Sequence, residues 1–412
     1  MYTSEARIRH RRVVLTAAFL LAMAASHIVL FVRLLPQLRS GYQDFVIFYS
    51  AGTMIRGGHA AQLYDPQAQW EMQRKFAPNV TARRAALPYN HPPFEALFFA
   101  PLTRLDFFSA YVVWTLLNLA LLAATLRVMW IGWGPTDVLA WPLALLGAAG
   151  FFPAAMTVVQ GQDSVLLLFL SVLGVAALSR GEDVAAGTIL ALGLFKFHLM
   201  LPLALVLAVR RPRLLAGFVP SALLLAATSV ATVGWSGALQ YVRFVFVAES
   251  QGTVSGITAS QMPSLHGLLA SLVGSVSAAM ALTAVASIAI LTLAMRRARQ
   301  PQTSLARLYA LAAATAVLVG FHTLQHDLSL LLPAGLLLLA HALGRDPASL
   351  RDWLLPAALF CTPLYLALGM AWDHLSLFAL VVLWLFAALW REEIGPWRRH
   401  DPPPQSATAE GV

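Results

Sequence analysis

A few aspartates, histidines and one lysine, set between long apolar stretches, are the residues of this sequence that could do chemistry. Lys196 stands between two short apolar runs and is one of only two lysines in the chain. Its ammonium group could face a phosphate, or it could reach water from a helix end. His322 and His326 lie four residues apart, and Asp327 follows directly. On a helix the two histidines would share a face and could bind a metal, a phosphate or a sugar, or only form hydrogen bonds. Because no third ligand is evident, we predict no metal site.

Two other polar groups also have both a structural and a functional interpretation. Asp44 precedes the apolar and aromatic stretch 45–49, where it could cap the N-terminus of a helix. The run Gln160-Gly161-Gln162-Asp163 could be a turn followed by a helix cap. An ionisable group at a membrane boundary is costly, so a functional role is the first hypothesis for each of them.

The stretches that separate these residues are apolar enough to cross a membrane. Of the 412 residues, 59% are hydrophobic and 11% are charged, whereas a soluble domain has about 45–50% apolar and about 25% charged residues. This composition excludes a soluble enzyme, a secreted disulfide scaffold and a disordered protein. A transmembrane helix needs roughly 20 apolar residues, so we predict an all-α polytopic membrane protein with about twelve segments, two of them short. The segments are 13–32, 107–131, 138–159, 164–178, 184–195, 197–209, 214–233, 265–295, 305–321, 328–343, 353–370 and 375–390.

The placement of the basic residues predicts the orientation of these segments. A net charge of +9 could indicate nucleic-acid binding, but 18 of the 28 lysines and arginines fall in the inner loops if the N-terminus is cytoplasmic. We therefore predict a multi-pass protein of the cytoplasmic membrane, with both termini in the cytoplasm and no nucleic-acid partner. The chain is expected to form one membrane domain, 1–412. It would have a long first outer loop (34–106) with two short helices, 45–56 and 66–76, and a cytoplasmic tail (391–412).

In this orientation the unusual polar residues gather on the outer side. A cluster contributed by many separate loops on one face is typical of a catalytic or binding surface. A secondary transporter would instead place polar groups near the bilayer midplane and would show repeated halves, neither of which is clear here. A ligase or flippase for lipid-linked glycans is the other alternative, but a ligase would more often carry its large outer loop late in the chain.

Several short motifs resemble glycosyltransferase family 87 in their order and spacing. They are Asp44 with Phe48-Tyr49-Ser50-Ala51-Gly52, Gly57-Gly58, Leu63-Tyr64-Asp65-Pro66, Leu87-Pro88-Tyr89-Asn90-His91-Pro92-Pro93-Phe94, Ala100-Pro101-Leu102, Trp114, Gly161-Gln162 and Leu194-Phe195-Lys196. The resemblance is densest from Asp44 to Asp163. The chain departs from the pattern at Asn90-His91, where relatives often carry an aromatic residue before the double proline.

The resemblance implies a GT-C-like fold with its active site at the outer membrane face. It implies an enzyme that takes a sugar, commonly mannose, from a polyprenyl-phosphate donor and passes it to a lipid or glycan acceptor among the membrane lipids. Asp44 matches the aspartate of the first outer loop that serves as the family's presumed catalytic base. The family's later histidine falls on His322 or His326, and the match does not choose between them.

The chemistry implied is transfer with inversion by a single carboxylate. That carboxylate takes the proton of the acceptor hydroxyl, and the phosphate leaves without an acid catalyst, unlike in glycoside hydrolysis, where two carboxylates are the rule. We predict no cofactor and no bound metal. Lys196 and His198 are the leading candidates to bind the donor phosphate, with His322 and His326 next. The predicted substrate-binding residues are Tyr49, Tyr64, His91, Gln162, Asp163 and Asp327.

Overall fold

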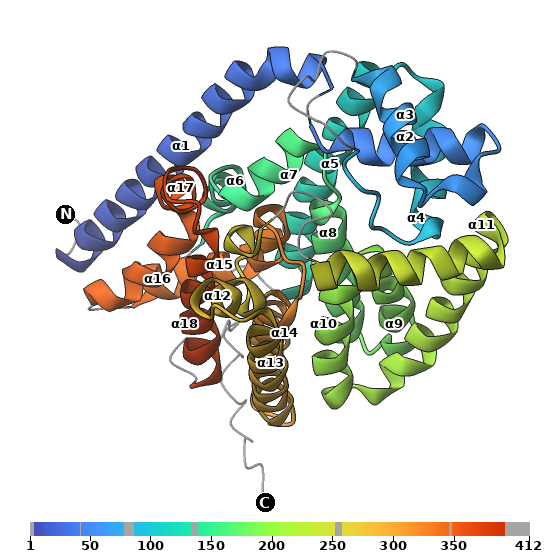
Figure 1. The fold of residues 1–412 in the computed structure, drawn as a ribbon. Coiled ribbons are helices and arrows are strands. Elements are labelled where there is room, and N and C mark those ends of the chain that lie inside the picture. Colours follow the sequence, from blue (N-terminus) through green and yellow to red (C-terminus); the bar gives the residue numbers. More distant parts are fainter. Residues whose placement is uncertain are drawn as a thin grey trace, which may run out of the picture.

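The computed structural model describes residues 4–41, 43–77, 86–133, 139–251, 258–345 and 348–391, and over these residues it contains helices and no strand (Figure 1). The predicted all-α fold is therefore confirmed. The α-helices are α1 (Ser4–Arg39), α2 (Phe45–Arg56), α3 (Pro66–Phe76), α4 (Pro93–Phe99), α5 (Phe107–Trp133), α6 (Trp141–Ala149), α7 (Phe152–Gln160), α8 (Ser164–Ser179), α9 (Asp183–Ala191), α10 (Phe197–Arg210), α11 (Leu215–Gln251), α12 (Leu265–Leu272), α13 (Val276–Ala298), α14 (Leu305–Val319), α15 (Leu332–Gly344), α16 (Leu350–Phe360), α17 (Thr362–Leu366) and α18 (Phe378–Trp390).

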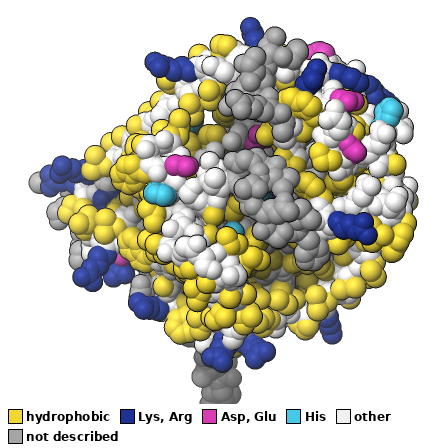
Figure 2. Space-filling model, viewed as in Figure 1, with side chains coloured by type: hydrophobic (Ala, Val, Ile, Leu, Met, Phe, Trp, Pro, Cys, Tyr) yellow, Lys and Arg dark blue, Asp and Glu magenta, His cyan; other side chains and the backbone are white. Residues whose placement is uncertain are grey.

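Apolar helices on the outside of the fold identify a polytopic membrane protein. Six helical segments are long and apolar enough to cross a membrane, or up to eight if each of two bent pairs, α6 with α7 and α16 with α17, counts as one span. In the most apolar window of α13 only 17% of the residues are buried, against 89% in the segment Gln325–Gly344. Lipid can therefore cover α13, while protein surrounds the other segment. Hydrophobic side chains are widespread on the face shown in Figure 2, and Lys and Arg lie mostly at its rim.

The predicted count of about twelve segments is not confirmed, and three predicted segments are broken: 138–159 and 353–370 are bent pairs, and 265–295 contains two helices. The run 265–295 is not one helix, because α12 ends at Leu272 and α13 begins at Val276. Ser275 causes the second start, since its side chain accepts a hydrogen bond from the backbone N–H of Ala278 and caps α13.

The chain reverses between α9 and α10, with the 3-10 turn η3 (Leu192–Lys196) at the tip. Asp183–Arg210 is long enough for a single span, but its two ends lie together. Arg211 Nη1 is 3.9 Å from Asp183 Oδ1, and a Cβ atom on Gly217 would stand 1.9 Å from the carbonyl oxygen of Val184. The two short runs predicted on either side of Lys196 are thus the arms of a hairpin that carries this lysine at its tip.

The first non-membrane segment contains the two short helices predicted there, α2 and α3. Asp65 caps α3 by accepting a hydrogen bond from the backbone N–H of Ala68 at 2.8 Å. Aromatic rings fix α2 in place, because Phe45 packs against Phe99 and Phe107 within 6.4 Å between ring centroids. This packing sets the position of the N-terminus of α2, where Asp44 lies.

Candidate active site

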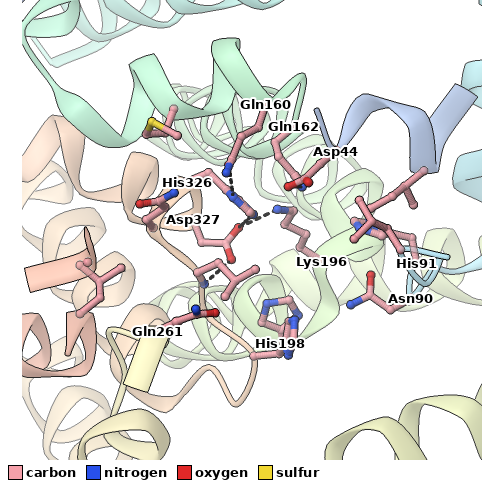
Figure 3. A pocket seen from close by; sticks show the side chains of 18 of the residues that line it. Asp44, Asn90, His91, Gln160, Gln162, Lys196, His198, Gln261, His326 and Asp327 are labelled. Carbon is pink, nitrogen blue, oxygen red and sulfur yellow. Dashed lines mark hydrogen bonds and ion pairs between the residues drawn. The ribbon is translucent and has the colours of Figure 1, made fainter. Parts of the chain in front are cut away.

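A cavity of about 610 Å³ lies between many parts of the chain. Its polar lining comes from the start of α2, the segment before α4, the α7–α8 turn, the tip of the α9–α10 hairpin, the 3-10 turn η5 (Ala259–Gln261) and the segment between α14 and α15. Figure 3 shows its polar side chains pointing toward one another from these separate elements. The polar lining residues are Asp44, Asn90, His91, Gln160, Gln162, Lys196, His198, Gln261, His322, Gln325, His326 and Asp327. The other part of the wall is apolar and includes Leu30, Leu34, Phe152, Met156, Leu366, Met370 and Leu375.

Asp44 occupies the N-cap position of α2 but makes no side-chain cap bond to that helix. Its carboxylate Oδ2 accepts a hydrogen bond of 3.0 Å from Gln162 Nε2, and the residue is partly exposed on the cavity wall. The partner comes from the α7–α8 turn, where Gly161 has a φ of +66°. A Cβ atom on Gly161 would stand 2.7 Å from Phe45 Cβ, so this turn packs closely on α2 only because the residue is glycine.

Helix α5 holds the same turn from the other side. Trp114 Nε1 donates a 2.9 Å hydrogen bond to the carbonyl oxygen of Gly161, and Asn118 Nδ2 donates to that of Gln162 at 3.3 Å. Both side chains are fully buried. The α7–α8 turn is therefore rigidly placed, and so are Gln162 at the cavity and Asp163 behind it.

Lys196 is the centre of a buried ion network. Its Nζ lies 2.9 Å from Asp163 Oδ1 and 2.6 Å from Asp327 Oδ1, and it donates a hydrogen bond of 2.8 Å to Ser164 Oγ. Only 3% of the lysine is exposed, so it is not a helix-end lysine that reaches water. Two carboxylates already compensate its charge, and a phosphate would have to share this ammonium group with them.

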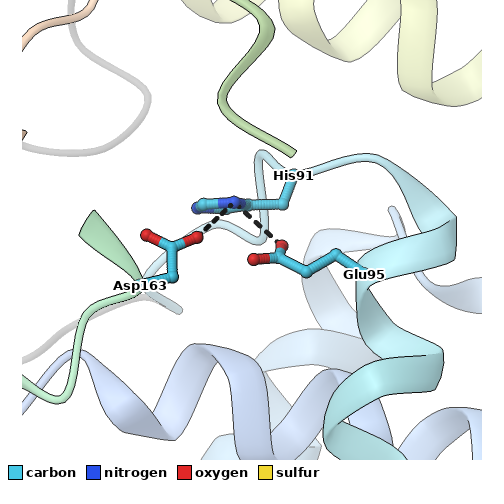
Figure 4. A group of neighbouring side chains, drawn as sticks. All are labelled: His91, Glu95 and Asp163. Carbon is cyan, nitrogen blue, oxygen red and sulfur yellow. Dashed lines mark ion pairs between the residues drawn. The ribbon is translucent and has the colours of Figure 1, made fainter. Parts of the chain in front are cut away.

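His91, Glu95 and Asp163 form a second buried group that adjoins this network (Figure 4). His91 Nδ1 lies 2.9 Å from Glu95 Oε2 and 3.5 Å from Asp163 Oδ2. Burial lowers the pKa of His91 to about 4, against the opposing effect of Asp163. Burial also raises the pKa of Glu95 well above its ordinary value, and the Asp163 carboxylate adds to the rise. Burial acts on Asp163 in the same direction, but the charges of Lys196 and His91 bring its pKa below the usual value.

The histidines of the cavity differ in their hydrogen-bond partners. His326 Nδ1 lies 3.0 Å from Gln160 Oε1, and its Nε2 is 3.6 Å from Asp327 Oδ1. His198 Nε2 is buried without a hydrogen-bond partner among the described residues. His322 is half-buried, and burial lowers its pKa.

His322 and His326 do not share a helical face, so that prediction is wrong. His322 lies in a turn, and the 3-10 helix η6 begins only at Gln325, where Asp327 Oδ2 accepts a hydrogen bond of 2.9 Å from the backbone N–H of Leu324. This cap starts a new helix between the two histidines. Both nevertheless line the cavity.

Three predicted substrate-binding residues do not line the cavity. Tyr49 donates a hydrogen bond to the carbonyl oxygen of Leu105 and packs against Phe76 in the aromatic cluster of the first segment. Tyr64 donates to the carbonyl oxygen of His91, so it supports a lining residue without being one. Asp163 is fully buried behind the wall. The aromatic types of Tyr49 and Tyr64 suited a sugar surface, but the fold uses them for packing.

Five residues of the site were not predicted from the sequence: Glu95 behind the wall, and Asn90, Gln160, Gln261 and Gln325 in the wall. The signal for Glu95 was present: it is an acid inside an apolar stretch, four residues after His91. That spacing places the two side chains together, and the structure pairs them. Asn90 is adjacent to His91, and Gln160 lies two residues before Gln162. The motifs were therefore recognised in the sequence, although these two residues were not predicted to line the cavity.

The arrangement combines one partly exposed carboxylate with a buried group of paired charges. Asp44 lies on the cavity wall, where its carboxylate can take a proton from a hydroxyl group placed in the cavity. Asp163 and Asp327 are bound to Lys196, which makes them weaker proton acceptors. The cavity can thus place an acceptor hydroxyl at Asp44 and a polar head group at the histidines, and a lipid chain can lie along its apolar wall.

Comparison with known proteins identifies a family. The family model of glycosyltransferase family 87 matches residues 89–320, which is more than half of the chain. The matched segment includes His91, Asp163 and Lys196, whereas Asp44 and Asp327 lie outside it. No curated protein and no solved structure matches the chain.

Proposed function

The chain belongs to glycosyltransferase family 87, and on this basis we propose that it moves a sugar from a polyprenyl-phosphate donor to a lipid or glycan acceptor. The observation that carries the proposal is the two-part wall of the cavity. Its polar part holds Asp44 and the histidines, and its apolar part is built from α1, α7 and the region of α17. A donor that joins a sugar phosphate to a long isoprenoid chain has the same two-part character.

Asp44 is the general base of the proposed reaction, and the transfer inverts the anomeric centre. Its carboxylate takes the proton of the acceptor hydroxyl while that oxygen attacks the sugar carbon from the side opposite the phosphate. The bond from carbon to phosphate oxygen breaks, and the polyprenyl phosphate leaves with the electron pair. This role is supported by the partial exposure of Asp44 on the cavity wall and by its position at the start of α2, where Gln162 Nε2 donates a hydrogen bond to the carboxylate.

The donor phosphate lies, in this proposal, between the hairpin tip and the segment that contains His322. His198 Nε2 has no hydrogen-bond partner among the described residues, and His198 and Lys196 both line this part of the cavity. Hydrogen bonds and charge aimed at the departing phosphate lower the barrier by several kcal/mol. We propose mannose as the sugar, in keeping with the family resemblance, and no cofactor in the transfer step.

A transfer assay tests the proposed function. Purified protein in lipid nanodiscs is given radiolabelled polyprenyl-phosphate mannose, polyprenyl-phosphate glucose or GDP-mannose, together with a total lipid extract as acceptor. We expect a labelled lipid product from a polyprenyl-phosphate donor and none from the nucleotide sugar. Movement of intact donor or free sugar across the bilayer of proteoliposomes, with no covalent product, would support a flippase or a transporter instead.

We further propose that the cavity opens to the outer face of the cytoplasmic membrane and that both termini are cytoplasmic. The distribution of basic residues supports this orientation. A cysteine-labelling experiment tests it in a Cys361→Ala background, with Gln67→Cys in α3 and Gln302→Cys between α13 and α14, which are both exposed positions. A membrane-impermeant thiol reagent added to sealed cells should label the first and spare the second. The reverse pattern would invert the topology.

A further inference from the structure

We propose that His91, Glu95 and Asp163 bind one divalent transition-metal ion of the zinc or manganese class. The proposal does not rest on the sugar transfer: Glu95 and Asp163 lie behind the cavity wall, and of the three residues His91 alone lines the cavity. It rests on the geometry of the three side chains, on their unpartnered atoms and on the charge of the buried network.

The distances between the ligand atoms suit a metal ion. One ligand atom from each residue lies within 4.8 Å of the other two, and His91 Nδ1 is 2.9 Å from Glu95 Oε2 and 3.5 Å from Asp163 Oδ2. Ligands bound at about 2.0–2.2 Å in tetrahedral or octahedral geometry stand roughly 3.0–3.5 Å apart. The separations of 2.9 and 3.5 Å from His91 Nδ1 lie at or close to this range, so the three side chains could be ligands of one ion.

The side chains are buried and carry atoms without hydrogen-bond partners. His91, Glu95 and Asp163 are 9%, 4% and 0% exposed. Glu95 Oε1 and Asp163 Oδ2 accept no hydrogen bond from another described residue while both acids are ionised, and an unmet oxygen of this kind is costly inside a protein. A proton shared between the Glu95 and Asp163 carboxyl groups would meet the need, and so would a metal ion. Lys196 forms an ion pair with Asp163 Oδ1, so Oδ2 is the carboxylate oxygen that can bind the metal ion.

The balance of charge favours a cation at this place. Glu95, Asp163 and Asp327 are three carboxylates, and Lys196 is the one ammonium group that contacts two of them. With all three acids ionised, this group of four side chains carries two net negative charges. A divalent ion brings the sum to zero, whereas a proton on Glu95 leaves one negative charge buried. One imidazole nitrogen with two carboxylate oxygens suits zinc or manganese better than calcium.

A metal-binding experiment on the full-length protein in detergent tests the proposal. Protein stripped with a chelator is given Zn²⁺, Mn²⁺ or Mg²⁺ alone, and bound metal is measured by mass spectrometry and the melting temperature by fluorimetry. We expect about one zinc or manganese ion per chain and a higher melting temperature. In Glu95→Gln the affinity should fall at least tenfold and the rise in melting temperature should disappear. Glu71→Gln, an exposed acid in α3, is the matched control and should behave as wild type.

Glu95→Gln also distinguishes the two ways of neutralising the Glu95 carboxylate, by a bound metal ion or by a proton. Glutamine resembles a protonated glutamate in size and hydrogen bonding. Glu95→Gln should therefore fold, and its melting temperature should equal that of the metal-free wild-type protein. If wild type retains no metal and shows no shift with any of the three ions, the proposal is overturned. It is equally overturned if Glu95→Gln binds metal as tightly as wild type. Co²⁺ absorption that changes in His91→Gln provides a second readout that does not depend on stability.

Discussion

The start of α2 and the start of α8 each carry an aspartate beside the cavity, but the two aspartates differ in their surroundings and in their proposed roles. Asp44 and Asp163 both occupy N-cap positions, and neither makes a side-chain cap bond. Asp44 is partly exposed and faces the amide of Gln162, whereas Asp163 is fully buried and paired with Lys196. The same residue type at the same helix position thus becomes a proposed base in one region and a structural anion in the other.

The comparison teaches that the neighbours of a carboxylate, more than its place on a helix, determine what it can do. Partial exposure on the cavity wall lets Asp44 meet a substrate hydroxyl and accept its proton. Lysine at 2.9 Å stabilises the charged form of Asp163 and makes it a poor base. Five substitutions test this division and the placement of the cavity wall.

Lys196→Met should have the largest effect, because it leaves Asp163 and Asp327 buried without their shared cation. Breaking a buried ion pair by removing one partner costs roughly 3–5 kcal/mol of folding stability. We expect a large fall in melting temperature in detergent, with loss of transfer activity. Lys75→Met, at an exposed position on α3, is the control and should melt as wild type. A Lys196→Met protein as stable as wild type would show that the network is not structural.

Asp44→Asn should abolish turnover while leaving the protein folded. Asparagine keeps the size of the side chain but cannot take a proton, and loss of a general base typically costs about 10²–10⁴ in rate. We expect transfer to fall at least about a hundredfold, with binding of the donor lipid and the melting temperature unchanged. Asp373→Asn is a matched control, since Asp373 is exposed and has a φ of 53°, which asparagine tolerates. Near-normal turnover by Asp44→Asn would remove the base assignment.

In Asp163→Asn we expect a clear loss of folding stability and a smaller loss of transfer activity, the reverse of Asp44→Asn. Lys196 keeps Asp327 as a partner, so the expected cost is about 1–3 kcal/mol, as for an unsatisfied buried polar group. Transfer per folded molecule should fall less than in Asp44→Asn. If Asp163→Asn folds normally and is inactive, the roles of the two aspartates are exchanged.

Tyr64→Phe and Tyr49→Phe should give the smallest effects and form a matched pair. Each removes one hydrogen bond from a phenol to a backbone carbonyl oxygen, which costs about 0.5–1.5 kcal/mol of stability. Only Tyr64 holds the carbonyl of His91, a residue of the cavity wall. Kinetic measurements should therefore show a raised KM for Tyr64→Phe and wild-type values for Tyr49→Phe. Equal KM values would place Tyr64 among residues that only pack.

The amino-acid sequence by itself determined the membrane class, most helices and the family. These depend on local composition and periodicity: apolar runs of sufficient length must become helices in lipid, and Asp65 before Pro66 marks the start of α3 whatever surrounds it. The sequence also placed Lys196 between two short runs, and the structure makes it the tip of a hairpin. The family motifs likewise lie within short stretches of chain.

Only the tertiary structure decided which polar residues face the cavity and which are paired behind it. Asp163 meets Lys196 from a segment 33 positions away, and Lys196 meets Asp327 from one 131 positions away. Tyr49 and Tyr64 point into an aromatic cluster instead of the cavity. Such contacts depend on the packing of helices that are distant in the chain, so residue types and local spacing cannot predict them. The charge state and role of each carboxylate follow from those contacts.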